Sequence, residues 1–91
     1  MNPNDIKDAH FYSSNNRPSL EKGEKCGCFN CLEIFDSSLI TRYYTAATRI
    51  DCLGTAICPF CGIDSVIGES SGYPITPAFL KEMQRYWFGV D

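Results

Sequence analysis

The sequence predicts a small α+β fold that is stapled by a metal site, and three observations lead to this prediction. The chain has 91 residues, which suits a single domain. A core built from so few residues supplies little stability, so a covalent or metal staple is expected. Four of the six cysteines form two CxxC pairs, Cys28–Cys31 and Cys58–Cys61. Short β-prone segments border both pairs, and an amphipathic helical pattern follows them.

Residues 1–25 form a polar N-terminal segment. Ile6, Ala9 and His10 have the spacing of one face of a short helix. The Arg17–Pro18 pair is expected to end that helix, because the residue before a proline is disfavoured in the helical conformation.

Residues 26–68 hold all the cysteines and form the predicted metal-binding ribbon. Leu32–Phe35 leaves the first pair as a predicted strand, and Asp36 to Ser38 then offer a cap for a short helix that runs to about Tyr44. Thr55–Ile57 leads into the second pair as a strand. Ile63–Ile67 leaves the second pair as another strand.

Residues 76–88 predict the C-terminal amphipathic helix, after a loop over residues 69–75. Thr76 is the expected N-cap, and Pro77 stands at the first helical position, where its missing N–H costs nothing. Gly89 is the expected stop. The predicted apolar face comprises Phe79, Met83, Tyr86 and Trp87. We expect Met83 and Trp87 in the core, with Tyr86 and Phe88 nearer the surface.

The two CxxC pairs predict one tetrahedral metal site with Cys28, Cys31, Cys58 and Cys61 as ligands. Two residues between cysteines let both sulfurs turn onto one ion, and two such turns complete a closed four-thiolate site. This is the arrangement of structural zinc, so the predicted fold is a zinc ribbon and the predicted cofactor is one Zn²⁺ per chain. Four thiolates also accept iron, which is the alternative metal. Buried free thiols are the non-metal alternative.

Cys26, Cys52 and His10 leave further alternatives open. Cys26 lies next to the first pair, so it is an alternative to Cys28 as a ligand. Cys52 is interpreted as a small core residue. His10, the one histidine, would complete a three-cysteine site, although a place on a helix face or at the surface explains it equally simply.

The second pair resembles two known motifs. Ile57–Gly62 (Ile-Cys-Pro-Phe-Cys-Gly) resembles a rubredoxin knuckle, but Leu32 stands after the first pair where rubredoxin normally has glycine. Cys58-Pro-Phe-Cys61 is also similar to a glutaredoxin active-site motif. That motif needs a helix directly after it to lower the thiol pKa, whereas Gly62 and residues 63–67 favour a turn and a strand.

The sequence disfavours an enzyme and a secreted protein. A closed four-sulfur site has no open position for water, and one histidine without a matched carboxylate pair offers little acid–base chemistry. Residues 1–25 contain no apolar run of signal-peptide length, and no stretch approaches a membrane span. The expected location is therefore the reducing cytoplasm, where cysteines bind metals rather than form disulfides.

Aromatic residues make up 13% of the chain, and they favour a protein partner. Phe29 and Phe60 lie inside the two pairs, where they are expected to shield the metal. The neighbours Tyr43–Tyr44 and residues 86–88 cannot all point inward, so some aromatic surface should be exposed. The leading functional prediction is a non-enzymatic protein-interaction module.

Two other functions stay open. The net charge of −3 is a poor match for phosphate, but Lys22, Lys25, Arg42 and Arg49 would form a basic patch if they gathered, as a nucleic-acid-binding zinc ribbon requires. A thiol/zinc redox switch centred on Cys26 and Cys28 is the other alternative.

Residues 26–91 are similar to a family of small bacterial proteins described as cytoplasmic proteins. The similarity rests on residues 26–31, 55–68 and 71–76 and on Trp87–Phe88. It implies a bacterial, non-secreted protein with a centre like that of a zinc ribbon, and it suits a regulatory or toxin-immunity role. It implies no activity, substrate or catalytic residue.

Overall fold

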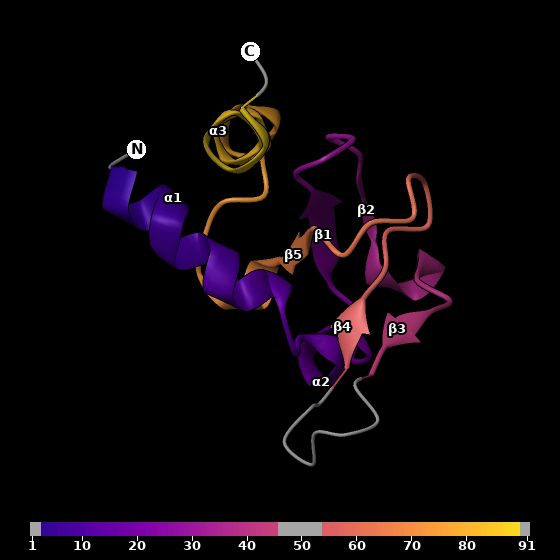
Figure 1. Cartoon of the computed structure of the whole chain (residues 1–91). Coiled ribbons are helices and arrows are strands. Elements are labelled where there is room, and N and C mark those ends of the chain that lie inside the picture. Colours follow the sequence, from indigo (N-terminus) through magenta and orange to yellow (C-terminus); the bar gives the residue numbers. More distant parts are fainter. Residues whose placement is uncertain (1–2, 46–53, 90–91) are drawn as a thin grey trace.

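The computed structural model describes residues 3–45 and 54–89, so Arg49 and Cys52 lie outside the described residues. Along the chain, the helices and 3-10 turns are α1 (Pro3–Ala9), η1 (His10–Ser13), α2 (Arg17–Leu20), η2 (Ser37–Leu39), η3 (Glu69–Ser71) and α3 (Pro77–Phe88). The strands are β1 (Lys25–Cys28), β2 (Ile34–Asp36), β3 (Tyr43–Tyr44), β4 (Thr55–Ala56) and β5 (Val66–Gly68). The molecule is therefore a small α+β fold with short antiparallel strands (Figure 1).

The main sheet has the order β2-β1-β5, and both pairings are antiparallel. The central residue Cys26 lies opposite Phe35 on β2 and Gly68 on β5. The strands β3 and β4 form a separate antiparallel pair. Strand β1, which the sequence analysis did not predict, is thus the centre of the main sheet.

Side chains alternate between the two faces of this sheet, as the strand repeat requires. Cys26 and Cys28 lie in one apolar cluster, and Ile67 on the adjacent strand lies in the other. The helix-side cluster comprises Ile6, Ala9, Phe29, Ile67, Ile75, Phe79, Leu80 and Met83. The cysteine-side cluster comprises Leu20, Cys26, Cys28, Phe35, Ile40, Ala56, Cys58 and Val66. The sheet therefore separates a helical layer from a layer that contains the cysteines.

Helices α1 and α3 lie against each other on the helix side (Figure 1). Gly27 on β1 faces this layer, and a Cβ added there would lie 2.7 Å from Leu80 Cδ1 and 3.2 Å from Ile75 Cγ2. A glycine at this position lets α3 approach the sheet closely.

Helix α3 confirms the boundaries predicted from the sequence. The Thr76 hydroxyl accepts a hydrogen bond from the Phe79 amide, and Gly89 ends the helix with φ +66°. Met83 is buried as predicted, and Tyr86 and Phe88 are exposed as predicted. The core position predicted for Trp87 is wrong: it is 36% exposed, and its Nε1 donates to the Ile6 carbonyl at 3.4 Å. Leu80, which the predicted apolar face omitted, is fully buried instead.

The N-terminal segment contains more helical turns than the one short helix predicted from the sequence. Ile6 and Ala9 are buried on one face of α1, as predicted. Arg17 and Pro18 do not end this helix, which gives way to η1 at His10. They begin α2 instead, because a proline in the first helical turn removes no intrahelical hydrogen bond.

The helix predicted from Asp36 to Tyr44 is wrong. Asp36 does cap a turn, since its carboxylate accepts a hydrogen bond from the Ser38 amide, but η2 ends at Leu39. Tyr43 and Tyr44 are in strand β3 because they pair with Ala56 and Thr55 on β4. Pairing with a distant strand outweighs the local cap, and tyrosine suits a strand well. The predicted loop over 69–75 also begins with the turn η3.

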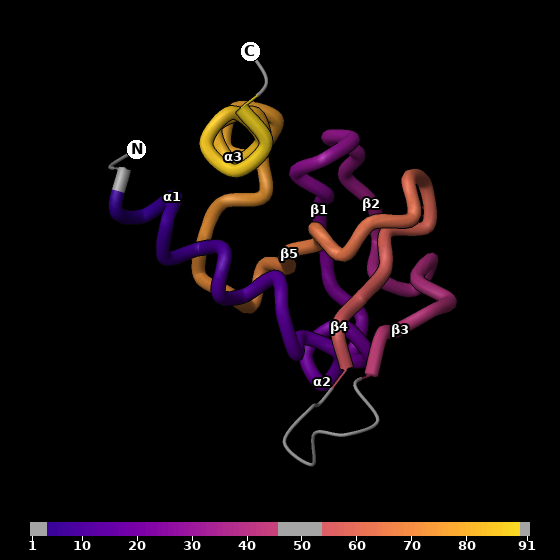
Figure 2. Tube along the Cα trace, viewed as in Figure 1, coloured from indigo at the N-terminus to yellow at the C-terminus, as the bar shows by residue number. Residues whose placement is uncertain are grey.

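Figure 2 follows the short β1–β2 turn and the longer β4–β5 connection over residues 57–65, which turns back on itself at the same end of the molecule. None of the helices in residues 3–45 and 54–89 is long and apolar enough to cross a membrane.

Candidate metal centre

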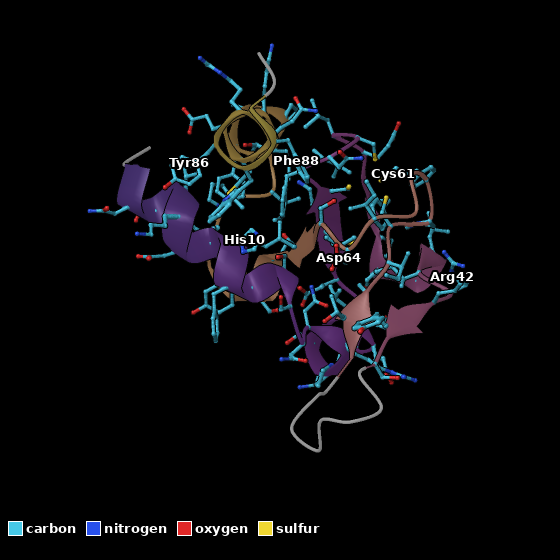
Figure 3. All side chains as sticks on the ribbon, viewed as in Figure 1. His10, Arg42, Cys61, Asp64, Tyr86 and Phe88 are labelled. Carbon is cyan, nitrogen blue, oxygen red and sulfur yellow. The ribbon has the colours of Figure 1, made fainter. Side chains whose placement is uncertain are left out.

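The β1–β2 and β4–β5 connections bring the four predicted cysteines together. The Sγ atoms of Cys28, Cys31, Cys58 and Cys61 all lie within 4.8 Å of one another. Cys28 Sγ is 3.6 Å from Cys61 Sγ, and Cys31 Sγ is 3.7 Å from Cys58 Sγ. A tetrahedron with metal–sulfur bonds of about 2.3 Å has edges of about 3.8 Å. Figure 3 labels Cys61 on the β4–β5 connection, beside the turn that carries the first pair. The four thiols therefore fit one tetrahedral ion.

The two CxxC turns have the same backbone hydrogen bonds. In the first turn, Leu32 N–H donates to the Cys28 carbonyl at 2.8 Å, and Cys28 N–H donates to the Glu33 carbonyl at 3.0 Å. In the second, Gly62 N–H donates to the Cys58 carbonyl at 2.9 Å, and Cys58 N–H donates to the Ile63 carbonyl at 3.0 Å. The centre is thus built from two copies of one turn, contributed by segments far apart in the sequence.

Each turn also points a backbone amide at its first cysteine. Asn30 N–H lies 3.3 Å from Cys28 Sγ, and Phe60 N–H lies 3.4 Å from Cys58 Sγ. An N–H donor stabilises a thiolate more than a neutral thiol. This arrangement is the one expected of cysteines that ligate a metal as thiolates.

A residue with positive φ closes each turn. Gly62 has φ +78°, which agrees with the conformational role expected of this glycine. Leu32, at the matching position, has φ +66° although it carries a side chain. The departure from the rubredoxin pattern at Leu32 therefore leaves the turn geometry unchanged, at a conformational cost.

Burial and hydrogen bonding act against each other on the thiol pKa values. Burial raises the pKa of Cys58, partly offset by the backbone amides of Phe60 and Cys61. Burial likewise raises the pKa of Cys31. At Cys61 burial also acts to raise the pKa, but hydrogen bonds led by the Asn30 side chain outweigh it and leave the pKa lowered. Desolvated thiols of this kind become thiolates when a cation balances their charge.

Two residues beside the cysteines were missed by the sequence analysis. The Ser65 side chain is buried, with its Oγ 3.0 Å from Cys28 Sγ. The Asn30 side chain is hydrogen-bonded to Cys61 and lowers the pKa of its thiol. The backbone carbonyl of Asn30 accepts a hydrogen bond at 2.8 Å from Gln84 Nε2 on α3. The signal for Ser65 was a small polar residue immediately before the apolar pair Val66–Ile67. Nothing local in the sequence distinguishes Asn30.

Cys26 and His10 lie outside the four-sulfur cluster. Cys26 Sγ donates to the Phe35 carbonyl at 3.5 Å, and burial, together with the charges of Glu24 and Asp36, raises its pKa to about 12. The structure thus places Cys28, and not Cys26, among the four sulfurs. The His10 ring packs on Trp87 with 4.0 Å between ring centroids.

The two phenylalanines of the CxxC turns do not shield the cysteines as a pair. Phe29 is buried in the helix-side cluster, because it follows Cys28 along the strand direction and points to the opposite face. Phe60 is 55% exposed, and its ring meets the Phe35 ring edge-on at 5.3 Å. The expectation of two aromatic shields is therefore wrong for Phe29.

Comparison with protein-family models, with curated proteins and with solved structures gave no match for this chain. The resemblance of residues 26–91 to small bacterial proteins therefore stays a prediction.

Proposed function

We propose that the chain binds one zinc ion through Cys28, Cys31, Cys58 and Cys61, and that it acts as a non-enzymatic protein-interaction module whose fold this ion holds. The observation that carries the metal proposal is the approach of four Sγ atoms within 4.8 Å of one another, from two turns of the same geometry.

The proposed role of the ion is structural. Four thiolates complete a tetrahedral shell and leave no position for water or substrate. Structural zinc sites contribute about 10–16 kcal/mol in peptides, compared with a total stability of about 5–15 kcal/mol for a typical domain. An ion at this place would join the β1–β2 connection to the β4–β5 connection.

The interaction role is supported by the aromatic side chains that the fold leaves in solvent. Phe11 and Tyr12 on η1 and Tyr86 and Phe88 on α3 are all exposed. Exposed aromatic groups of this kind are typical of surfaces that bind other proteins. The acidic net charge of −3 favours a protein over a nucleic acid.

The metal proposal is tested by elemental analysis of protein purified without added metal. We expect one zinc per wild-type chain, none in Cys58→Ser, and one in Cys26→Ser. Cys26 is a matched control, because it is equally buried but lies outside the four-sulfur cluster. Metal-free wild-type protein, or Cys58→Ser with a full zinc content, would refute the site. If the purified protein is red and contains one iron per chain, the metal at this site is iron and not zinc.

The interaction proposal is tested by affinity capture from the host with wild-type protein and with the double variant Phe11→Ala/Tyr86→Ala. We expect a protein that the wild type retains and the variant loses, because both side chains are exposed and their removal should leave the fold intact. Retention of DNA or RNA that weakens steeply with salt would instead support the nucleic-acid alternative.

A further inference from the structure

A cavity of about 560 Å³ lies between η1, α2 and η3, and no cysteine is among its described lining residues. It is of the size that small-molecule and side-chain ligands occupy. The residues that define its chemistry are His10, Phe11, Tyr12, Asn16, Glu24 and Ser70. Figure 1 shows the N-terminal helix continuing from α1 toward α2. The N-terminal part of the chain therefore meets the segment after β5 at this cavity.

Glu24 places a carboxylate in this cavity. Its Oε2 accepts hydrogen bonds from the Ser70 amide at 3.1 Å and from the Ser70 hydroxyl at 2.9 Å. Within residues 3–45 and 54–89, its Oε1 accepts no hydrogen bond. A Cβ at Gly68 would collide with Glu24 Oε2, so the glycine at this position is what lets the carboxylate reach Ser70. The carboxylate is therefore held in place with one oxygen available to a ligand.

Two aromatic side chains also line the cavity. Phe11 is 77% exposed, and its ring meets the Tyr12 ring edge-on with 5.4 Å between centroids. Both residues line the cavity. Aromatic faces attract cations and also cover the aliphatic stems of long cationic side chains.

The charged residues that line the cavity indicate the charge of its ligand. Glu24 is the one carboxylate among the described lining residues, and neither lysine nor arginine is among them. We propose that this cavity binds an arginine or lysine side chain of a partner protein. Glu24 Oε1 accepts a hydrogen bond from the guanidinium or ammonium group, and Phe11 and Tyr12 cover its stem. This rests on the interaction role proposed above, and it names the surface and the partner chemistry.

The test is a titration of the metal-loaded full chain, followed by amide chemical shifts in NMR. The probes are N-acetyl-arginine amide, N-acetyl-lysine amide and the neutral isostere N-acetyl-citrulline amide. We expect saturable shifts at the Asn16 and Ser70 amides with the two cations and none with citrulline. Equal binding of citrulline, or no shift at these amides, would overturn the proposal.

Two variants and one control variant test the proposed contacts. Glu24→Gln keeps an acceptor for Ser70 but removes the charge, and we expect affinity for arginine amide to fall about tenfold or more. Glu82→Gln, an exposed change of the same charge on α3, should leave affinity unchanged. Phe11→Ala alters a side chain that is mostly in solvent, so it tests the site even if Glu24→Gln fails to fold. We expect Phe11→Ala to weaken binding several-fold. If Phe11→Ala binds arginine amide as tightly as the wild type, Phe11 does not contact the ligand.

A pentapeptide with one central arginine distinguishes a protein partner from a free organic cation. Tighter binding of the peptide than of arginine amide supports the partner, whereas equal binding would overturn that assignment. The cavity proposal and the interaction role also fail separately. A chain that ignores arginine amide but still captures a protein from the host refutes the cavity alone. A chain that binds arginine amide but captures no protein refutes the interaction role.

Discussion

At the scale of single residues, the turns around the cysteines depend on the backbone conformation of the residue that follows each pair. Leu32 and Gly62 have nearly the same positive φ, but the left-handed conformation costs a side-chain-bearing residue about 1–2 kcal/mol and costs glycine almost nothing. Leucine recovers part of this cost, because Leu32 packs against the helix-side cluster. The leucine is thus a compromise between turn geometry and packing.

We predict that Leu32→Gly is more stable than Leu32→Ala, by about 1 kcal/mol in urea unfolding. Both variants lose the packing of the leucine side chain, but glycine also relieves the backbone. In a helix or strand the order would be the reverse. Alanine that equals or exceeds glycine in stability would show that φ at residue 32 is not positive in solution.

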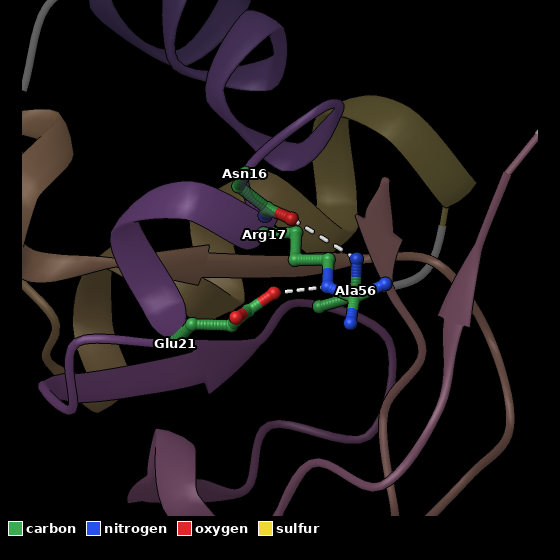
Figure 4. Close-up of polar contacts among 4 residues, drawn as sticks. All are labelled: Asn16, Arg17, Glu21 and Ala56. Atoms are coloured by element: carbon green, nitrogen blue, oxygen red, sulfur yellow. Dashed lines mark hydrogen bonds and ion pairs between the residues drawn. The ribbon is translucent and has the colours of Figure 1, made fainter. Parts of the chain in front are cut away.

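At the scale of the elements, Asn16 joins segments that are distant in the sequence. Its side-chain amide donates to the Val66 carbonyl at 2.8 Å and to the Tyr12 carbonyl at 3.2 Å. Its carbonyl oxygen accepts from the Ala56 amide at 3.0 Å (Figure 4). Through this residue the segment before α2 connects β4 of the small sheet to β5 of the main sheet. The neighbouring ion pair joins Arg17, the first residue of α2, to Glu21 just after the helix, and both side chains are exposed (Figure 4).

Asn16→Ala is predicted to lower the free energy of unfolding by about 2–4 kcal/mol, because Ala56 N–H and the Val66 carbonyl lose their partner in the interior. Glu21→Ala is the control beside it and should cost less than about 1 kcal/mol, as exposed ion pairs do. Urea unfolding followed by circular dichroism measures both changes. Equal costs for the two variants would contradict the bridging role of Asn16.

At the scale of the whole molecule, two apolar clusters lie on opposite faces of a three-stranded sheet, and only one of them contains the cysteines. Helix α3 has 12 residues, a length at which an isolated helix is marginal in water. Its stability therefore depends on packing against the sheet beneath it, and the first CxxC turn joins two strands of that sheet, β1 and β2.

Removal of the proposed metal is therefore expected to disrupt both faces together. A strong chelator should abolish the near-UV circular dichroism signal and lower the helical signal as well, and added zinc should restore both. A chelator-treated chain, shown to be metal-free, that keeps its melting temperature would contradict the structural role of the metal.

The four cysteines and helix α3 were predictable from the sequence, because local chemistry determines them. CxxC spacing alone turns two sulfurs toward one point, and Thr76, Pro77 and Gly89 define the ends of the helix through caps within one turn of chain. The approach of the two cysteine pairs to each other, which the prediction required, is what the structure adds. The identity of the metal depends on chemistry that neither the spacing nor the geometry specifies.

Other features were decided by tertiary structure alone, since they depend on which strand lies beside which. Tyr43 and Tyr44 follow a valid helix cap, yet they form a strand because β4 supplies hydrogen-bond partners. Cys28 joins the cluster and Cys26 does not, although both point to the same face of β1, because the second CxxC turn lies at the Cys28 end of the strand. Trp87 stays 36% exposed because its ring packs on His10 and its Nε1 donates to the Ile6 carbonyl, both in a segment about 80 residues earlier in the chain. Local sequence determines turns and caps, whereas the position of each side chain depends on distant segments that compete for the same space.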